Sequence, residues 1–134
     1  MERRLILDTS GLIAYERETI RRAQFADDDV VVAAISIAEF RVGAEHADTP
    51  ERRDRRLDIL ADIRATVDVL DYTEATAVEH AKLLAFVQRT GRPRGLHDLI
   101  IAAHAAEKNR TIVTADAAAR FGDLPGVAAI TPTR

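Results

Sequence analysis

The residues of this sequence best suited to chemistry are four carboxylates, each placed where a strand is expected to end or a helix to begin. They are Asp8, Glu39, Asp98 and Asp116. Helix capping is the ordinary reason for acids at helix starts, and Ser36-x-x-Glu39 matches a capping box. Capping does not explain, however, why no basic residue accompanies these acids. Four carboxylates in one pocket would raise one another's pKa, and a divalent cation such as Mg²⁺ or Mn²⁺ would offset their repulsion.

Metal ions held by carboxylates have one common use on phosphodiesters. The ion lowers the pKa of a bound water, which attacks phosphorus, and a second ion can stabilise the leaving oxygen. One ion or two would fit the same ligands. This chemistry needs no histidine as general base, so His97, next to Asp98, is interpreted as a structural residue.

Apolar runs predict the strands that must bring these acids together. Buried strands are expected at residues 5–7, 30–34, 67–72 and 111–114, with a possible fifth at 127–130. A turn at 9–11 is expected to lead into helical structure from Leu12 to about residue 26. Further helices are expected from Ser36, over 51–65, from Thr73 or Thr76 to Gly91, over 98–108 and, as a short one, over 115–121.

The alternation of short buried strands with helices predicts an α/β fold with a parallel sheet covered on both faces. Ligands of such sheets bind beyond the carboxyl ends of the strands. Asp8, Glu39 and Asp116 would lie at that edge, and Asp98 would join them if its helix begins there.

Composition narrows the class of protein further. The chain of 134 residues is expected to form one domain over 1–134, and the absence of cysteine excludes disulfides, thiol catalysis and Cys-ligated metal. A net charge of −3 gives no general signal for polyanion binding. The apolar runs are too short to cross a membrane, and the first residues do not form a secretory signal, so a cytoplasmic location is expected.

Four segments occur in an order that resembles one known family. They are Leu7-Asp8-Thr9-Ser10, Ser36-x-x-Glu39-Phe40-x-x-Gly43, the run His97-Asp98-Leu99-Ile100-Ile101-Ala102-Ala103, and Val113-Thr114-Ala115-Asp116 followed by Phe121. Over essentially the whole chain, the sequence resembles the PIN-domain ribonucleases, and in particular the VapC toxins of bacterial toxin–antitoxin pairs.

The resemblance implies a fold, an activity and a set of partners. The fold would be a three-layer α/β/α sandwich with a short, mostly parallel sheet of four or five strands. The activity would be that of an endoribonuclease dependent on Mg²⁺ or Mn²⁺, which inhibits translation and growth. The partners would be RNA, a second copy in a homodimer, and a VapB-type antitoxin whose tail covers the acidic cleft.

The resemblance also assigns site residues. Asp8, Glu39, Asp98 and Asp116 would form the catalytic and metal-binding quartet, the last of them directly or through water. Ser10 and Thr114 would be the supporting polar residues. The downstream Asp123 is interpreted as a turn residue.

The sequence gives weaker indications of which residues contact RNA. Arg92 and Arg94 lie in a Gly/Pro loop just before Asp98 and are candidates for phosphate contacts. The arginines between residues 52 and 56 alternate with acids and are interpreted as a salt-bridged helix face. Whether the substrate is tRNA, ribosomal RNA or messenger RNA is left open by the sequence.

Two other functions fit part of the pattern. A haloacid-dehalogenase-type phosphatase also places an Asp after the first strand, but it expects a second Asp where Ser10 stands and a positioned lysine. A non-catalytic binding module could keep the same fold without turnover.

Overall fold

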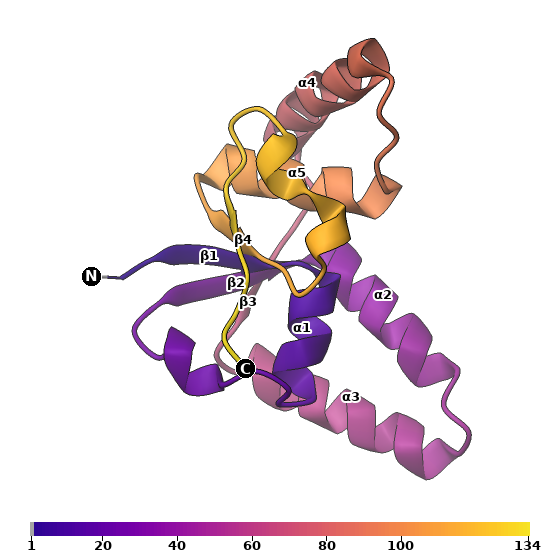
Figure 1. The fold of residues 1–134 in the computed structure, drawn as a ribbon. Coiled ribbons are helices and arrows are strands. Elements are labelled where there is room, and N and C mark those ends of the chain that lie inside the picture. Colours follow the sequence, from indigo (N-terminus) through magenta and orange to yellow (C-terminus); the bar gives the residue numbers. More distant parts are fainter. Residues whose placement is uncertain (1) are drawn as a thin grey trace.

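The structure is a computed structural model and describes residues 2–134. Its centre is a parallel sheet in the order β3-β2-β1-β4-β5 (Figure 1). The strands are β1 (Arg4–Leu7), β2 (Asp29–Ala33), β3 (Asp68–Leu70), β4 (Thr111–Val113) and β5 (Ala129–Ile130). The predicted α/β class, the parallel sheet and all five strand positions are therefore confirmed.

The helices form a layer on each face of the sheet. α1 (Thr9–Glu16), α2 (Ala34–Glu45) and α3 (Pro50–Arg64) lie on one side, and α4 (Glu74–Thr90) and α5 (Leu96–Lys108) on the other (Figure 1). Short 3-10 helices complete the chain: η1 (Arg22–Phe25), η2 (Ala117–Ala119) and η3 (Phe121–Asp123). The arrangement is the expected three-layer α/β/α sandwich.

Alternation along the strands explains the two layers, because successive strand side chains point to opposite faces. Ile6, Val31 and Ile112 pack with the apolar residues of α4 and α5. Their neighbours Leu7 and Val32 pack on the other side with α1, α2 and α3. β1, β2 and β4 are thus buried, as the continuous apolar runs predicted, while the edge strands β3 and β5 are partly exposed.

Local signals set several helix ends as expected. Thr49 caps α3, Thr73 and Thr76 form a capping box at the start of α4, and Gly91 ends that helix in the left-handed conformation with φ 65°. Asn109 has the same role after α5, with φ 53°.

Other boundaries differ from the prediction. α1 begins at Thr9 and ends at Glu16, instead of following a turn and continuing towards residue 26. α2 begins at Ala34, so Ser36 is a buried residue inside the helix and not its cap. The short helix expected over 115–121 is two 3-10 turns, because Arg120 between them adopts a left-handed conformation with φ 47°.

Within residues 2–134, none of the helices combines the length and the apolar character that crossing a bilayer would require.

Candidate active site

Asp8 lies at the carboxyl end of β1, in the middle of the sheet. Its side chain is buried, with the residue 3% exposed, and Oδ1 accepts hydrogen bonds from Ser10 Oγ and Gly11 N, both at 2.7 Å. Burial raises the pKa of Asp8, and hydrogen bonds from neighbouring groups partly offset that effect. The residue caps α1 as its position suggested, yet it also keeps a carboxylate buried at the edge of the sheet.

Gly11 permits a close approach of two elements at this edge. A Cβ at this position would lie 2.5 Å from the carbonyl oxygen of Val113 and 3.2 Å from Asp8 Oδ1. Because glycine lacks this atom, the first turn of α1 packs directly on the end of β4. The carboxyl ends of β1 and β4 are thereby held together.

Ser10 and Thr114 connect these two strand ends through their hydroxyl groups. Ser10 Oγ lies 3.4 Å from Thr114 Oγ1 and accepts a hydrogen bond from Ala115 N at 2.9 Å. Thr114 Oγ1 in turn accepts from Asp116 N at 3.0 Å. Both residues that the resemblance named as supporting polar groups therefore brace the loop that carries Asp116.

Glu39 is bound at both of its carboxylate oxygens by groups from other elements. Oε1 accepts a hydrogen bond from Thr9 Oγ1 at 2.6 Å, and Oε2 lies 3.2 Å from His97 Nδ1. Thr9 Oγ1 is also 3.1 Å from Ser36 Oγ. The capping-box interpretation of Glu39 is thus wrong: the side chain extends across to α1 and α5, not back to its own helix start.

Asp98 is the third residue of α5 and stands near all three other acids. Burial raises the pKa of Asp98, and the negative charges of Asp8, Glu39 and Asp116 raise it further, while His97 lowers it. Gly95, and not Asp98, is the N-cap of this helix. The helix begins at the carboxyl edge of the sheet, which was the condition for Asp98 to join the group.

Asp116 is the outermost of the four acids. It is exposed, and its Oδ1 accepts a hydrogen bond from Ala118 N at 3.0 Å, which caps η2. Its influence on the pKa values of both Asp8 and Asp98 nevertheless places it within electrostatic reach of the group. The four predicted carboxylates therefore share one edge of the sheet, and we refer to them below as the acidic cluster.

The acidic cluster fits a hard divalent cation by the chemistry of its donors. Within residues 2–134, no three Asp, Glu or His side chains already form a compact metal shell. Burial and, after it, the charges of the other three acids raise the pKa of Asp98. Mg²⁺ keeps several waters and needs only one or two protein carboxylates, so the group can bind such an ion without a preformed cage of three.

Two residues of this region were not recognised from the sequence. Thr9 carried no assigned role, and His97 was interpreted as structural, although its ring faces Glu39. A depression lined by Glu39, Gly95, Leu96, His97 and Asp98, about 360 Å³ in volume, opens at this point. The contacts of Thr9 and of His97 with Glu39 each join segments far apart in the chain, so no local sequence pattern predicts them.

The two candidate arginines for RNA contact have different environments. The Arg94 side chain is 7% exposed, and its Nη1 donates to the carbonyl oxygens of Ala119 at 2.6 Å and Arg120 at 2.7 Å. This geometry does not favour the predicted phosphate contact of Arg94, because its Nη1 is already engaged and the side chain is largely buried. Arg92 is exposed on the same loop.

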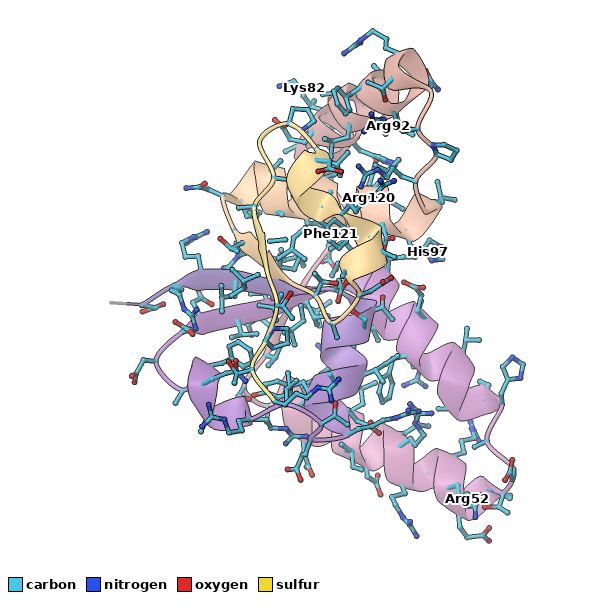
Figure 2. The ribbon with its side chains drawn as sticks, viewed as in Figure 1. Arg52, Lys82, Arg92, His97, Arg120 and Phe121 are labelled. Carbon is cyan, nitrogen blue, oxygen red and sulfur yellow. The ribbon has the colours of Figure 1, made fainter. Side chains whose placement is uncertain are left out.

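Two arginines of α3 form ion pairs, but with acids that precede the helix and not with the acids that alternate with them, as the prediction had it. Arg52 pairs with Asp48 at 2.7 Å and Arg53 with Glu45 at 3.2 Å. Figure 2 shows Arg52 at the far end of α3, well away from His97. This surface is therefore separate from the acidic cluster.

Comparison with known proteins identifies the family. A family model described as PIN domain matches residues 5–125. A ribonuclease VapC5 from Mycobacterium tuberculosis is 32% identical over 93% of this chain and 90% of its own length. The chain belongs to the PIN-domain family.

Within that family, the chain is similar to the VapC proteins. A tRNA(fMet)-specific endonuclease VapC from Shigella flexneri is 35% identical over 62% of this chain and 61% of its own length. The crystal structure of DNA-bound VapBC from Salmonella typhimurium superposes with a TM-score of 0.85 at 27% identity, and the match covers 98% of each chain. The resemblance drawn from the four sequence segments is thus confirmed.

The phosphatase alternative loses its support in this structure. Position 10 is a serine whose hydroxyl donates to Asp8, where that family expects a second aspartate. Lys82 and Lys108 pair with Glu79 and Glu107, next to them on α4 and α5. The lysine that such a phosphatase needs is therefore not found at the acidic cluster among the described residues.

Proposed function

We propose that this PIN-domain protein is an endoribonuclease that depends on Mg²⁺ or Mn²⁺ and acts as the toxin of a type II toxin–antitoxin pair. The observation that carries the proposal is the acidic cluster itself, in which Asp98 experiences the charges of three other carboxylates. The named activities of the VapC relatives support the same reaction class.

In this proposal, Asp8, Glu39 and Asp98 hold the cation, and Asp116 binds it directly or through water. When bound, one ion or two would supply the positive charge that activates water and stabilises the phosphate. Thr9 and His97 keep the Glu39 carboxylate oriented. Ser10 and Thr114 keep the loop of Asp116 against the end of β1. Arg92 is proposed to contact an RNA phosphate from the neighbouring loop.

The partners follow from the charge and the shape of the site. A VapB-type antitoxin tail with a basic side chain would complement the acidic cluster, and the VapBC complexes among similar structures support such a partner.

We also propose a homodimer. The apolar depression formed by Ala34, Ala38, Tyr72 and Ile100 is a surface that a second copy could cover. Action in the cytoplasm and inhibition of translation belong to the same proposal.

RNA cleavage by the purified chain tests this function. Cleavage is expected with Mg²⁺ or Mn²⁺ and not with a chelator. Asp8→Asn and Asp98→Asn are each expected to reduce the rate by about 100-fold or more, since even residues that only support metal ligands contribute about 10–100-fold. Asp54→Asn, which makes the same charge change on the exposed face of α3, is the matched control.

Three results would contradict the proposal. Cleavage that persists in chelator would exclude the metal-dependent mechanism, and full activity of both variants would remove the acidic cluster from it. Hydrolysis of a small phosphate ester without any RNA cleavage would favour the phosphatase. A folded protein that binds RNA without cutting it would be the non-catalytic module.

A further inference from the structure

A second cavity lies at the end of α4, and the proposed mechanism uses none of its lining except Arg92. Its volume is about 310 Å³, and it is lined by Phe86, Val87, Thr90, Arg92, Arg94 and Asp123. The end of α4, the loop at residues 91–95 and η3 each contribute to its wall. Figure 2 shows Arg92 between the end of α4 and His97.

The cavity is close to the acidic cluster along the chain. Arg94 precedes Asp98 by four residues, which span at most about 14 Å even when fully extended. Asp123, which also lines the cavity, follows the loop that carries Asp116. A strand of RNA whose phosphate meets the acidic cluster would therefore have a neighbouring nucleotide near this cavity.

The lining combines an apolar surface with one carboxylate, that of Asp123, and with the polar groups of Thr90, Arg92 and Arg94. Phe86 and Val87 are partly buried against the core and supply the apolar part. Asp123 has a side chain that is 51% exposed, and its Oδ2 lies 3.7 Å from Arg94 Nη2, too long for a direct hydrogen bond. Its carboxylate is thus able to accept hydrogen bonds from a ligand, next to a guanidinium that can donate one.

Arg94 keeps the walls of the cavity in place. Its two hydrogen bonds to the carbonyl oxygens of Ala119 and Arg120 join the 91–95 loop to the segment after Asp116. Arg120 has φ 47°, an unfavourable conformation for a residue other than glycine. A turn of this kind persists because its surroundings fix it, so the cavity is preorganised before any ligand arrives.

We propose that this cavity binds one base of the RNA substrate and that the base is guanine. The inference rests on the proposed ribonuclease function and adds a sequence preference to it. Proteins read single-stranded RNA by taking a splayed base onto an apolar or aromatic surface and bonding to its edge. Phe86 and Val87 provide that surface.

The edge of guanine matches the polar groups of the cavity. Its N1–H and N2–H groups are neighbouring donors that one carboxylate accepts together, and its O6 is an acceptor beside them. Asp123 would accept from the two donors, while Arg94 Nη2 would donate to O6. Adenine, cytosine and uracil lack the neighbouring pair of donors, so they would leave the carboxylate incompletely paired.

A set of short RNAs tests the preference. Each has uridine throughout except for one position, which carries guanine, adenine, cytosine or uridine. The chain is expected to cut beside guanine about 10- to 100-fold faster than at the same place in the other RNAs. Asp123→Asn, in which an amide replaces the acceptor, is expected to bring that ratio close to one. Asp54→Asn, the same change on α3, should keep the full ratio.

Binding of mononucleotides gives a readout that is independent of cleavage. Asp98→Asn protein is titrated with guanosine or adenosine monophosphate and followed by NMR. Guanosine monophosphate is expected to bind more tightly, with shifts at Phe86 and Asp123 that disappear when Asp123→Asn is added. Cleavage without any preference for guanine, or equal binding of the two nucleotides, would overturn the base site and leave the ribonuclease proposal intact. Selective binding without metal-dependent cleavage would support the base site and overturn the ribonuclease proposal.

Discussion

At the scale of single residues, the acidic cluster is built from carboxylates that have a second task in the fold. Asp8 and Asp116 cap α1 and η2 through Oδ1, and Glu39 joins α2 to Thr9 and His97. Capping and metal binding are therefore not competing interpretations here. The hydrogen bonds that satisfy the folded chain also fix the orientation of the oxygens that a cation would meet.

Thr9 gives the sharpest test of this orientation. Thr9→Val keeps the shape of the side chain but removes the donor 2.6 Å from Glu39 Oε1. We expect the Mg²⁺ concentration for half-maximal cleavage to rise by about tenfold or more, as for other residues that orient metal ligands. Thr9→Ser, which retains the hydroxyl, should stay close to the parent protein. An unchanged metal titration for Thr9→Val would show that Glu39 needs no such support.

Asp98 should limit the stability of the metal-free protein. Its raised pKa means that the ionised carboxylate is less favourable in the folded chain than in the unfolded one. The metal-free protein therefore loses stability as the pH rises from the ordinary carboxyl pKa of about 3.9 through the raised value. At neutral pH and in chelator, we expect Asp98→Asn to melt about 2–5 °C above the parent.

The pH dependence of this difference identifies its cause. As the pH falls through the raised pKa, the parent's Asp98 becomes protonated and resembles the amide, so the two melting temperatures should converge. Excess Mg²⁺ should raise the melting temperature of the parent and leave the variant almost unchanged. A variant that melts below the parent at neutral pH would mean that the burial and repulsion of the ionised Asp98 are not the dominant effect.

At the scale of elements, the contact of α1 with β4 depends on a missing side chain. Gly11→Ala would place a Cβ 2.5 Å from Val113 O, a backbone atom that cannot move aside easily. We expect a loss of about 1–3 kcal/mol in the free energy of unfolding, measured in urea, because overpacking of this kind distorts the backbone. Cleavage should fall as well, since the shift separates Asp8 from the loop of Asp116.

Gly43 in α2 is the matched control for that substitution. A Cβ there would lie 3.4 Å from Arg56 Nη1, which is an ordinary van der Waals contact. Gly43→Ala is therefore expected to stabilise the protein by about 0.5–1 kcal/mol through its helix propensity. Equal effects of the two substitutions would show that the close approach at Gly11 is not what requires glycine.

The elements were largely predictable, and the contacts between them were not. Continuous apolar runs and the helix breaker Gly91 are local signals, and they located the strands and the end of α4. Ser36-x-x-Glu39 shows the limit of such signals. This sequence pattern is typical of a capping box, but Ser36 is buried within α2, and Glu39 accepts a hydrogen bond from Thr9 of another helix.

The same distinction applies to the acidic cluster. Its members could be predicted because each follows a strand or opens a helix, and a parallel sheet brings those points to one edge. Thr9, His97 and Arg94 could not be assigned in this way, since their tasks depend on partners 25 or more positions away in the chain. For such residues, only the packed structure determines which atoms meet.

At the scale of the whole molecule, the acidic cluster joins both helical layers to the sheet. Glu39 comes from the layer of α1, α2 and α3, Asp98 comes from the layer of α4 and α5, and Asp8 and Asp116 follow the central strands. A cation bound by these groups would therefore add a further link between the two helical layers, which at this edge are joined by the contact of Glu39 with His97. Binding of the cation should then stabilise segments in all three layers.

Amide hydrogen exchange measures this linkage directly. On addition of Mg²⁺, we expect slower exchange in the first turns of α1, α2 and α5 and in the segment 115–120, all over the same range of metal concentration. The protection follows from mass action, and at a metal concentration of about 100 times the dissociation constant it corresponds to about 2.7 kcal/mol. In Asp98→Asn protein the effect should disappear from all four segments together, while Asp54→Asn should retain it. Protection confined to α5 would mean that the ion binds Asp98 alone and that the layers are not coupled through the acidic cluster.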